Sequence, residues 1–260
     1  MLAREKFMRR FASTLAHCLP YTQRQKIKAV PGILALQYLV FQRDMRSQFV
    51  TGATRICLEG FPRSGNGFAY ACVRDILGVP QDGIAHHTHS FANVRRATQR
   101  RIPTFVLMRE PLDCCLSAVL WGVCNTLEDA VSAYIQFHVG LPLLLERITI
   151  VPFEQLTGNP RIFLRHVARD TESWDFIWDE RAAEFVKSVI READERIHGD
   201  NVRRIILPSP EKESYKKDIL ARCLTPKAVR LLESARLLMT EIIAAAPSLA
   251  ASSLVAEPNK

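Results

Sequence analysis

Short apolar runs alternate with helical stretches along the middle of the chain. The apolar runs predict buried strands over 54–58, 104–108 and 148–153. The sequence between and after them predicts helices over 68–77, 111–123, 127–145, 180–196 and 226–245. Strands that alternate with helices in this way predict an α/β fold, in which helices cover both faces of a central parallel sheet.

Several helix ends are marked by residues with a known capping preference. Pro111 is placed where a helix begins, because its missing N–H costs nothing in the first turn. Asn159-Pro160 and Thr225-Pro226 each have the pattern of an N-cap residue followed by proline at the first helical position. Gly78 is a natural C-terminal stop for the helix before it.

The remaining segments are predicted from weaker patterns. Residues 1–50 have a helical character and are predicted to pack on the core as an N-terminal segment. Residues 51–245 are predicted to form the α/β domain, and the small, polar tail 246–260 is predicted to be frayed. The segment 79–101 shows no regular pattern and is predicted to be irregular, although it holds three of the seven histidines.

Composition narrows the class of protein. A chain of 260 residues with 48% hydrophobic residues is long enough for one domain with a substantial core. The net charge of +8 favours anionic partners, among which charge alone does not distinguish nucleotides, nucleic acid, acidic lipids and acidic glycans. The seven cysteines have no CxxC or zinc spacing, so reduced thiols and a cytoplasmic location are predicted. No apolar run reaches the length of a membrane-spanning helix.

The first 19 residues form a basic amphipathic pattern. Four cationic side chains lie beside four large apolar ones, namely Arg4, Lys6, Arg9 and Arg10 beside Phe7, Met8, Phe11 and Leu15. Such a helix either docks on its own domain or touches a membrane surface, and the sequence allows both interpretations. The segment lacks the apolar centre and the cleavage site of a secretory signal.

The segment 57–68 joins the first predicted strand to a helix and contains three glycines. Gly60 and Gly65 have the spacing of a Walker A phosphate loop, but Asn66 and Gly67 stand where that motif has lysine and serine or threonine. The cation of this loop is instead Arg63. The arrangement favours an anion bound by backbone N–H groups and arginine without Mg²⁺, and the alternative is a glycine-rich turn with one surface arginine.

At this loop the chain resembles the sulfotransferase family. Phe61-Pro62-Arg63-Ser64-Gly65-Asn66 is similar to the family's phosphosulfate loop, commonly written [YF]-P-[KR]-S-G-[TN]-[TS]. A second family element follows the next strand, as Arg109-Glu110-Pro111-Leu112-Asp113 with Ser117 eight residues beyond the arginine. A weaker, third similarity lies in 151–156 and the following Asn159-Pro160. Together these pieces cover residues 57 to about 165.

The resemblance implies a P-loop NTPase-like three-layer fold and the binding of 3′-phosphoadenosine 5′-phosphosulfate (PAPS) without a metal. The phosphosulfate group would be held by Arg63, Ser64, Gly65, Asn66, Gly67 and Phe68. Arg109 and Ser117 would hold the 3′-phosphate. The chain departs from the family at Gly67, where a hydroxyl is usual, and in the C-terminal basic loop, for which Arg203-Arg204 is only a partial substitute.

The resemblance also implies catalytic residues. Thr88-His89 matches a Thr-His pair whose histidine deprotonates the acceptor hydroxyl, and His87 occupies a position that is often lysine. Arg63 would stabilise the charge that develops as the S–O bond breaks. Two alternatives for the histidine cluster are a metal site and a solvated loop without a chemical role. Trp121, Trp174 and Trp178 are predicted to be core residues, and the alternative is that a single one of them lines an acceptor cleft.

Three functions therefore remain open from the sequence. An active sulfotransferase would use PAPS and an acceptor with a hydroxyl or an amine as its partners, and would bind no nucleic acid. A P-loop nucleotide-binding protein or kinase would need Mg²⁺ and ATP, which the missing lysine and hydroxyl residues disfavour. A non-catalytic scaffold on the same fold is favoured by Gly67 and by the unclear C-terminal loop.

Overall fold

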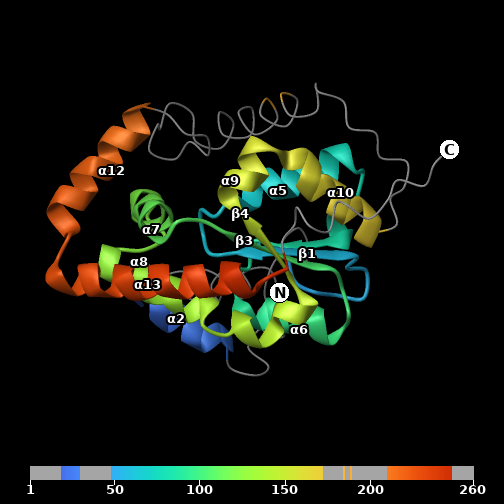
Figure 1. The fold of residues 1–260 in the computed structure, drawn as a ribbon, viewed down its shortest axis with the longest axis horizontal. Coiled ribbons are helices and arrows are strands. Elements are labelled where there is room, and N and C mark those ends of the chain that lie inside the picture. Colours follow the sequence, from blue (N-terminus) through green and yellow to red (C-terminus); the bar gives the residue numbers. More distant parts are fainter. Residues whose placement is uncertain (1–18, 30–47, 172–183, 185–187, 189–209, 248–260) are drawn as a thin grey trace, which may run out of the picture.

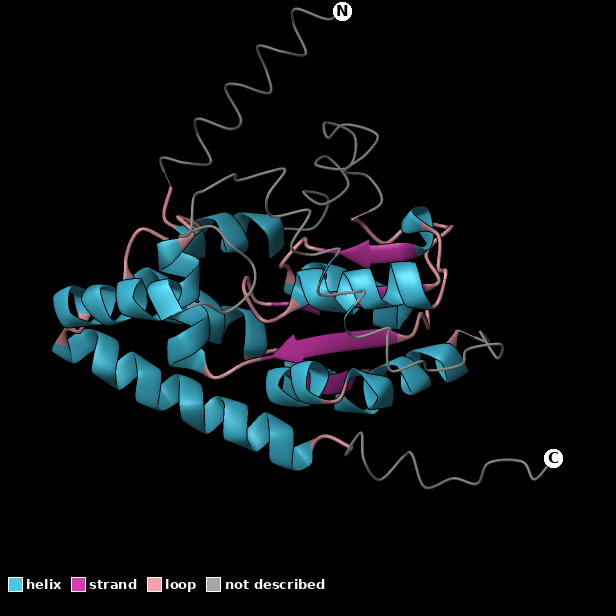
Figure 2. Cartoon of the chain, turned by 90° about the horizontal axis from the view of Figure 1, so that it is seen from above, coloured by secondary structure: helices cyan, strands magenta, loops and turns pink. Residues whose placement is uncertain are grey.

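The computed structural model describes residues 19–29, 48–171, 184, 188 and 210–247 (Figure 1). Its centre is a four-stranded sheet in the order β2-β1-β3-β4, in which all neighbouring strands are parallel. The arrows in Figure 2 accordingly point the same way. The strands are β1 (Ile56–Gly60), β2 (Ile84–His86), β3 (Thr104–Met108) and β4 (Thr149–Pro152).

Helices form a layer on each face of this sheet (Figure 1). The first layer contains α5 (Asn66–Ala71) with the π-helical turn Cys72–Ile76, α9 (Phe153–Gly158) and α10 (Pro160–Asp170). The second layer contains α2 (Tyr21–Ala29), α6 (Phe91–Gln99), α7 (Pro111–Leu120), α8 (Leu127–His138) and α13 (Pro226–Ala245). A further helix, α12 (Pro210–Cys223), packs on α7.

The alternation of side chains along β3 connects the two layers. Phe105 and Leu107 point into the core beneath α5 and α10, whereas Val106 and Met108 point into the core beneath α7, α8 and α13. All of these side chains are fully buried. A strand that is apolar on both faces belongs in a parallel sheet with two covering layers, and the predicted α/β fold is confirmed.

The predicted elements match the structure where the patterns are long. The strands predicted over 54–58, 104–108 and 148–153 correspond to β1, β3 and β4. Gly78 ends its helical segment with a positive φ of 64°. Thr225 caps α13 by accepting a hydrogen bond from the amide of Ala228, as predicted, whereas the side chain of Asn159 makes no capping bond to α10.

Two predictions were wrong in detail. The segment 79–101 is not irregular, since it contains a 3₁₀ turn at Gln81–Gly83, strand β2 and helix α6. The helix predicted over 127–145 ends at His138 and is followed by a 3₁₀ helix at Leu141–Arg147. Pro142 lies in the first turn of that second helix, where a missing N–H is tolerated. The same proline could not donate the backbone hydrogen bond that a continuation of α8 would need.

Some predictions fall outside the described residues. They concern residues 1–18 of the amphipathic segment, the helix 180–196 apart from the helical residues 184 and 188, Arg203-Arg204 and the tail beyond residue 247. Within the described part, no helix has the length and apolar content needed to cross a membrane. The six cysteines described there are free thiols.

The connections leave the sheet in opposite directions after β1 and β3. The chain passes from β1 to α5 in one layer, and from β3 to α7 in the other. Because β1 and β3 are neighbours, a crevice opens between their carboxyl ends. Ligands of open α/β sheets bind at such a topological switch point.

Candidate functional site

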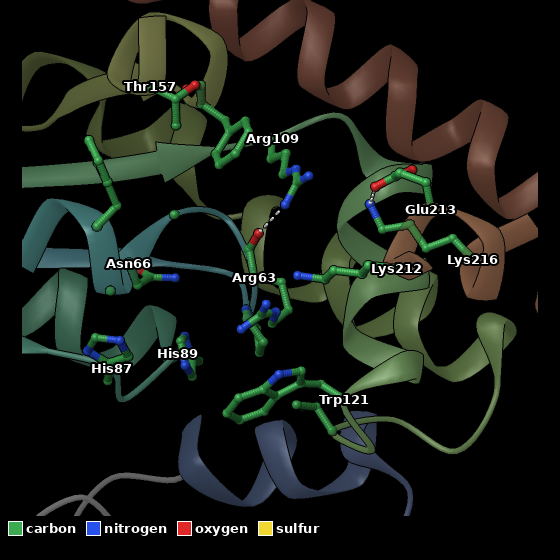
Figure 3. A pocket seen from close by; sticks show the side chains of 16 residues that line it. Arg63, Asn66, His87, His89, Arg109, Trp121, Thr157, Lys212, Glu213 and Lys216 are labelled. Carbon is green, nitrogen blue, oxygen red and sulfur yellow. Dashed lines mark hydrogen bonds and ion pairs between the residues drawn. The ribbon is translucent and has the colours of Figure 1, made fainter. Parts of the chain in front are cut away.

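A cavity of about 380 Å³ lies at this switch point (Figure 3). Its wall is contributed by the β1–α5 loop, the ends of β2, β3 and β4, the end of α7 and helix α12. The lining residues are Pro62, Arg63, Gly65, Asn66, Gly67, Phe68, His87, His89, Arg109, Trp121, Val123, Phe153, Thr157, Lys212, Glu213 and Lys216. The volume suits a small-molecule ligand such as a nucleotide.

The β1–α5 loop can fold as it does because of two glycines. A Cβ on Gly60 would lie 2.7 Å from the carbonyl oxygen of Leu107, which the close pairing of β1 and β3 does not allow. Gly65 has a φ of 95°, and a Cβ there would meet the ring of Phe153 at 3.1 Å. The loop is then closed by Asn66, whose Nδ2 donates to the carbonyl of Phe61 at 3.0 Å.

Arg109 connects the end of β3 to this loop. Its Nη1 donates to the carbonyl oxygen of Arg63 at 3.0 Å, and its Nη2 forms an ion pair with Asp113 on the first turn of α7. The guanidinium lies over the ring of Phe153, 4.1 Å from its centroid. The backbone of Arg109 is fixed as well, because the hydroxyl of Tyr134 donates to its carbonyl at 2.9 Å. The two sequence motifs therefore meet through one arginine (Figure 3).

Arg63 projects into the cavity from a strained backbone. Its φ is 73°, in the left-handed region that residues other than glycine rarely adopt. Its Nε donates to the hydroxyl oxygen of Ser117 at 3.1 Å, and its guanidinium lies 4.8 Å from the ring centroid of Trp121. Trp121 thus lines the cavity, and the prediction that it is a core residue was wrong. The other two tryptophans lie outside the described residues.

His87 and His89, from the histidine cluster 86–89, line the cavity across from Lys212 and Lys216 of α12 (Figure 3). His89 has a φ of 50°, and its Nδ1 lies 2.8 Å from the carbonyl oxygen of Gly60. A carbonyl only accepts, so Nδ1 carries the proton and Nε2 is the basic nitrogen of the neutral ring. This tautomer is the one that a general base facing the cavity requires.

The neighbouring histidines are held neutral. The Nδ1 atoms of His86 and His87 are 2.5 Å apart, and His86 packs against the ring of Tyr70. Burial lowers the pKa of His86 to about 2 and that of His87 to about 4. The described residues contain no group of three or more histidine, cysteine or acidic side chains that could hold a metal ion.

Backbone strain is concentrated around the cavity. Four residues other than glycine have a positive φ in the described part of the chain: Arg63, His87, His89 and Arg101. The first three line the cavity. Each costs on the order of 1–3 kcal/mol and persists only where the surrounding structure enforces it, which is typical of functional sites.

Helix α12 contributes two lysines that the sequence analysis missed. Lys212 and Lys216 are one helical turn apart, and both line the cavity although they are only 3% and 4% exposed. Lys216 forms ion pairs with Asp113 and Glu213, and Lys212 extends towards Arg63 (Figure 3). The i, i+4 spacing of the two lysines is the signal that could have revealed them.

The structure places most, but not all, of the predicted site residues in the cavity. Arg63, Gly65, Asn66, Gly67, Phe68, His89 and Arg109 line it. Ser64 does not, because its hydroxyl is fully buried 3.3 Å from the thiol of Cys114. Ser117 is also fully buried, and it reaches the site only through its contact with Arg63.

The wall of the cavity is rich in cationic side chains. Among the described lining residues, Arg63, Arg109, Lys212 and Lys216 contribute four cations and Glu213 one carboxylate, and Asp113 behind the wall pairs with both Arg109 and Lys216. Gly65 and Gly67 have no side chain to keep an anion away from the backbone N–H groups of the loop and of the start of α5. No protein-family model, curated protein or solved structure matches this chain.

Proposed function

We propose that this protein is a PAPS-dependent sulfotransferase that transfers a sulfuryl group to a hydroxyl or amine acceptor by in-line displacement. The observation that supports this proposal is the meeting of Arg63, Arg109 and a correctly oriented His89 in one cavity.

The residues present fit the cofactor. Four cations suit a ligand that carries phosphate groups at both its 3′ and 5′ positions. Nε of Arg109 is buried without a partner among the described residues, and so is Oδ1 of Asn66. Lys216 shares the carboxylate of Asp113 with Arg109, and Lys212 lines the same cavity. The two lysines would supply the C-terminal cations for which the sequence offered only Arg203-Arg204. When bound, PAPS supplies an activated sulfuryl group on a good leaving group.

Each side chain would then have one task. Nε2 of His89 takes the proton from the acceptor as its oxygen or nitrogen attacks, which is worth roughly 10²- to 10⁴-fold in rate. The guanidinium of Arg63 stabilises the negative charge that develops on the departing phosphate oxygen. Arg109 holds the loop that carries Arg63, so that both charges are in place before the reaction.

Calorimetry tests the proposal against its alternatives. The metal-free protein is titrated with 3′-phosphoadenosine 5′-phosphate and, separately, with ATP and Mg²⁺. We expect binding of the 3′-phosphate nucleotide alone, weakened by Arg109→Ala and unchanged by Arg95→Ala, an exposed arginine on α6 outside the cavity. Preference for ATP with Mg²⁺ would favour a nucleotide-binding protein or kinase, and no binding of either would favour a scaffold.

Catalysis is tested after binding. Acceptors from the carbohydrate, lipid, small-alcohol and peptide classes are screened with PAPS, and His89→Ala serves as the control. Transfer that is abolished by His89→Ala while nucleotide binding persists is the result expected of an enzyme with a histidine base.

A further inference from the structure

A buried carboxylate lies directly behind the histidine wall of the cavity. Glu59 is the penultimate residue of β1 and is fully buried, yet the rest of that strand is apolar or glycine. Its side chain points to the same face of the sheet as Cys57, which packs beneath α6. A charged group in such a position requires several hydrogen bonds to be tolerated.

The partners of Glu59 all lie in or next to the histidine loop. Oε1 accepts from the amide of Thr88 at 3.2 Å, from its hydroxyl at 2.5 Å, and from Nδ2 of Asn93 at 2.9 Å. Oε2 accepts from the amide of His89 at 2.9 Å. One carboxylate therefore accepts hydrogen bonds from two consecutive backbone N–H groups, those of Thr88 and His89.

This arrangement fixes the direction of the His89 ring. His89 has a positive φ of 50°, a left-handed backbone conformation that residues other than glycine rarely adopt unless other contacts hold them there. The bond from its amide to Oε2 of Glu59 holds that backbone, and the ring then reaches the carbonyl of Gly60, the residue next to Glu59 on β1. Strand β1 thus supplies both the acceptor for the backbone and the acceptor for the ring.

We propose that Glu59 is a positioning residue that orients His89 and selects its Nδ1–H tautomer. The contribution of Glu59 to catalysis rests on the proposed function, whereas the orientation of the His89 ring by Glu59 does not. Glu59 does not line the cavity, so it acts only through His89.

Glu59→Gln is the informative substitution because it keeps the size and removes one acceptor. If the amide oxygen faces Thr88 and Asn93, the new NH₂ group meets the N–H of His89, and two donors oppose each other. The reverse orientation places the NH₂ against the amide of Thr88 and Nδ2 of Asn93. Asn93 cannot turn its own amide to compensate, since its Oδ1 accepts from the amide of Val50 at 3.1 Å.

The orientation is tested without any ligand, by ¹H–¹⁵N correlation spectra of protein labelled with ¹⁵N-histidine at a pH of about 8, where an ordinary imidazole is neutral. His89 is assigned by its loss in His89→Gln. We expect a protonated Nδ1 in the parent protein and loss of that signature in Glu59→Gln. Thr88→Val is the matched control, because it disturbs the same network but leaves the bond between Oε2 and the His89 amide.

Glu59→Asp covers the case in which Glu59→Gln does not fold, since it keeps the charge but shortens the reach to His89, and it is expected to lose the same signature. An unchanged His89 spectrum in a folded Glu59 variant, or an equal change in Thr88→Val, overturns the proposal. With PAPS and an acceptor, the variant should lower kcat about 10-fold or more at unchanged nucleotide affinity. Loss of the tautomer without any nucleotide binding would refute the proposed function and leave the positioning role intact.

Discussion

A Cβ atom on Gly67 would lie 4.0 Å from Nε2 of His87, and no other atom of the described residues outside the local helix would be as near. Gly67 has no positive φ that would require glycine. The site thus has room for the hydroxyl that the sulfotransferase resemblance leads one to expect at this position, and that room faces a neutral imidazole.

Gly67→Ser is therefore expected to fold and to bind the 3′-phosphate nucleotide more tightly. One neutral hydrogen bond contributes about 0.5–1.5 kcal/mol, or roughly a 2- to 10-fold gain in affinity. Calorimetry with 3′-phosphoadenosine 5′-phosphate measures the change. Gly158→Ser is the control, because Gly158 also has open space but lies outside the cavity. Weaker binding by Gly67→Ser alone would show that a ligand occupies this space.

Arg109→Lys is expected to behave almost like Arg109→Ala. The planar guanidinium of Arg109 donates to the carbonyl of Arg63 and pairs with the carboxylate of Asp113 at the same time. The single ammonium group of a lysine cannot reproduce this two-pronged geometry. We predict a loss of nucleotide affinity of about 10-fold or more for both variants. Arg95→Lys provides the comparison on α6. Binding by Arg109→Lys at the parent level would mean that charge alone matters at this position.

Lys216 is expected to contribute to binding, and its neighbour Lys217 is not. Lys216 is buried between Asp113 and the cavity, whereas Lys217 is exposed on the outer face of α12. Lys216→Met removes a cation near the ligand, so affinity for the nucleotide should fall several-fold and depend less steeply on salt. Both variants, Lys216→Met and Lys217→Met, are titrated with the nucleotide at two salt concentrations. A loss of affinity in Lys216→Met alone indicates a contact with the ligand, whereas an equal loss in both variants indicates an effect of net charge.

The fold was predictable where a segment is long and apolar on both faces. The run 104–108 coincides with β3 because every residue in it is buried. Strand β2 has three residues, too few for a pattern, and its burial depends on pairing with β1. Helix α12 was not predicted because its amphipathic pattern is weak. Its contact with α7 joins segments far apart in the sequence and is visible only in the folded chain.

The site was predictable where residues follow a strand. Arg63, His89 and Arg109 come after β1, β2 and β3, and the carboxyl ends of parallel strands meet at one edge. Lys216 lies 103 residues beyond its partner Asp113, so no local pattern joins them. Glu59 was overlooked because the predicted strand ended at residue 58, whereas β1 continues to Gly60 and buries this side chain. A lone acid beside an apolar run is itself a sign of a buried hydrogen-bonded carboxylate.

The ionisation of Glu59 should appear in the pH dependence of stability. Burial raises the pKa of Glu59 from its ordinary value of 4.5 to about 7, and the hydrogen bonds from Thr88, Asn93 and His89 only partly oppose that rise. The folded protein therefore holds this proton more tightly than the unfolded chain does. The resulting stabilisation is fully present below pH 4.5 and is lost as the pH rises to about 7, by about 3 kcal/mol in total.

Comparison with Glu59→Gln isolates this contribution, because glutamine does not titrate. The buried histidines with lowered pKa, His86, His87 and His138, change stability in the opposite direction over an overlapping range, but they are present in both proteins. Urea unfolding at a series of pH values gives the two free energies of unfolding. We expect the parent protein to lose stability relative to Glu59→Gln between about pH 4.5 and pH 7 and to level off above that range. A difference that stays constant with pH would mean that Glu59 keeps its ordinary pKa, and that the hydrogen bonds to the histidine loop fully offset its burial.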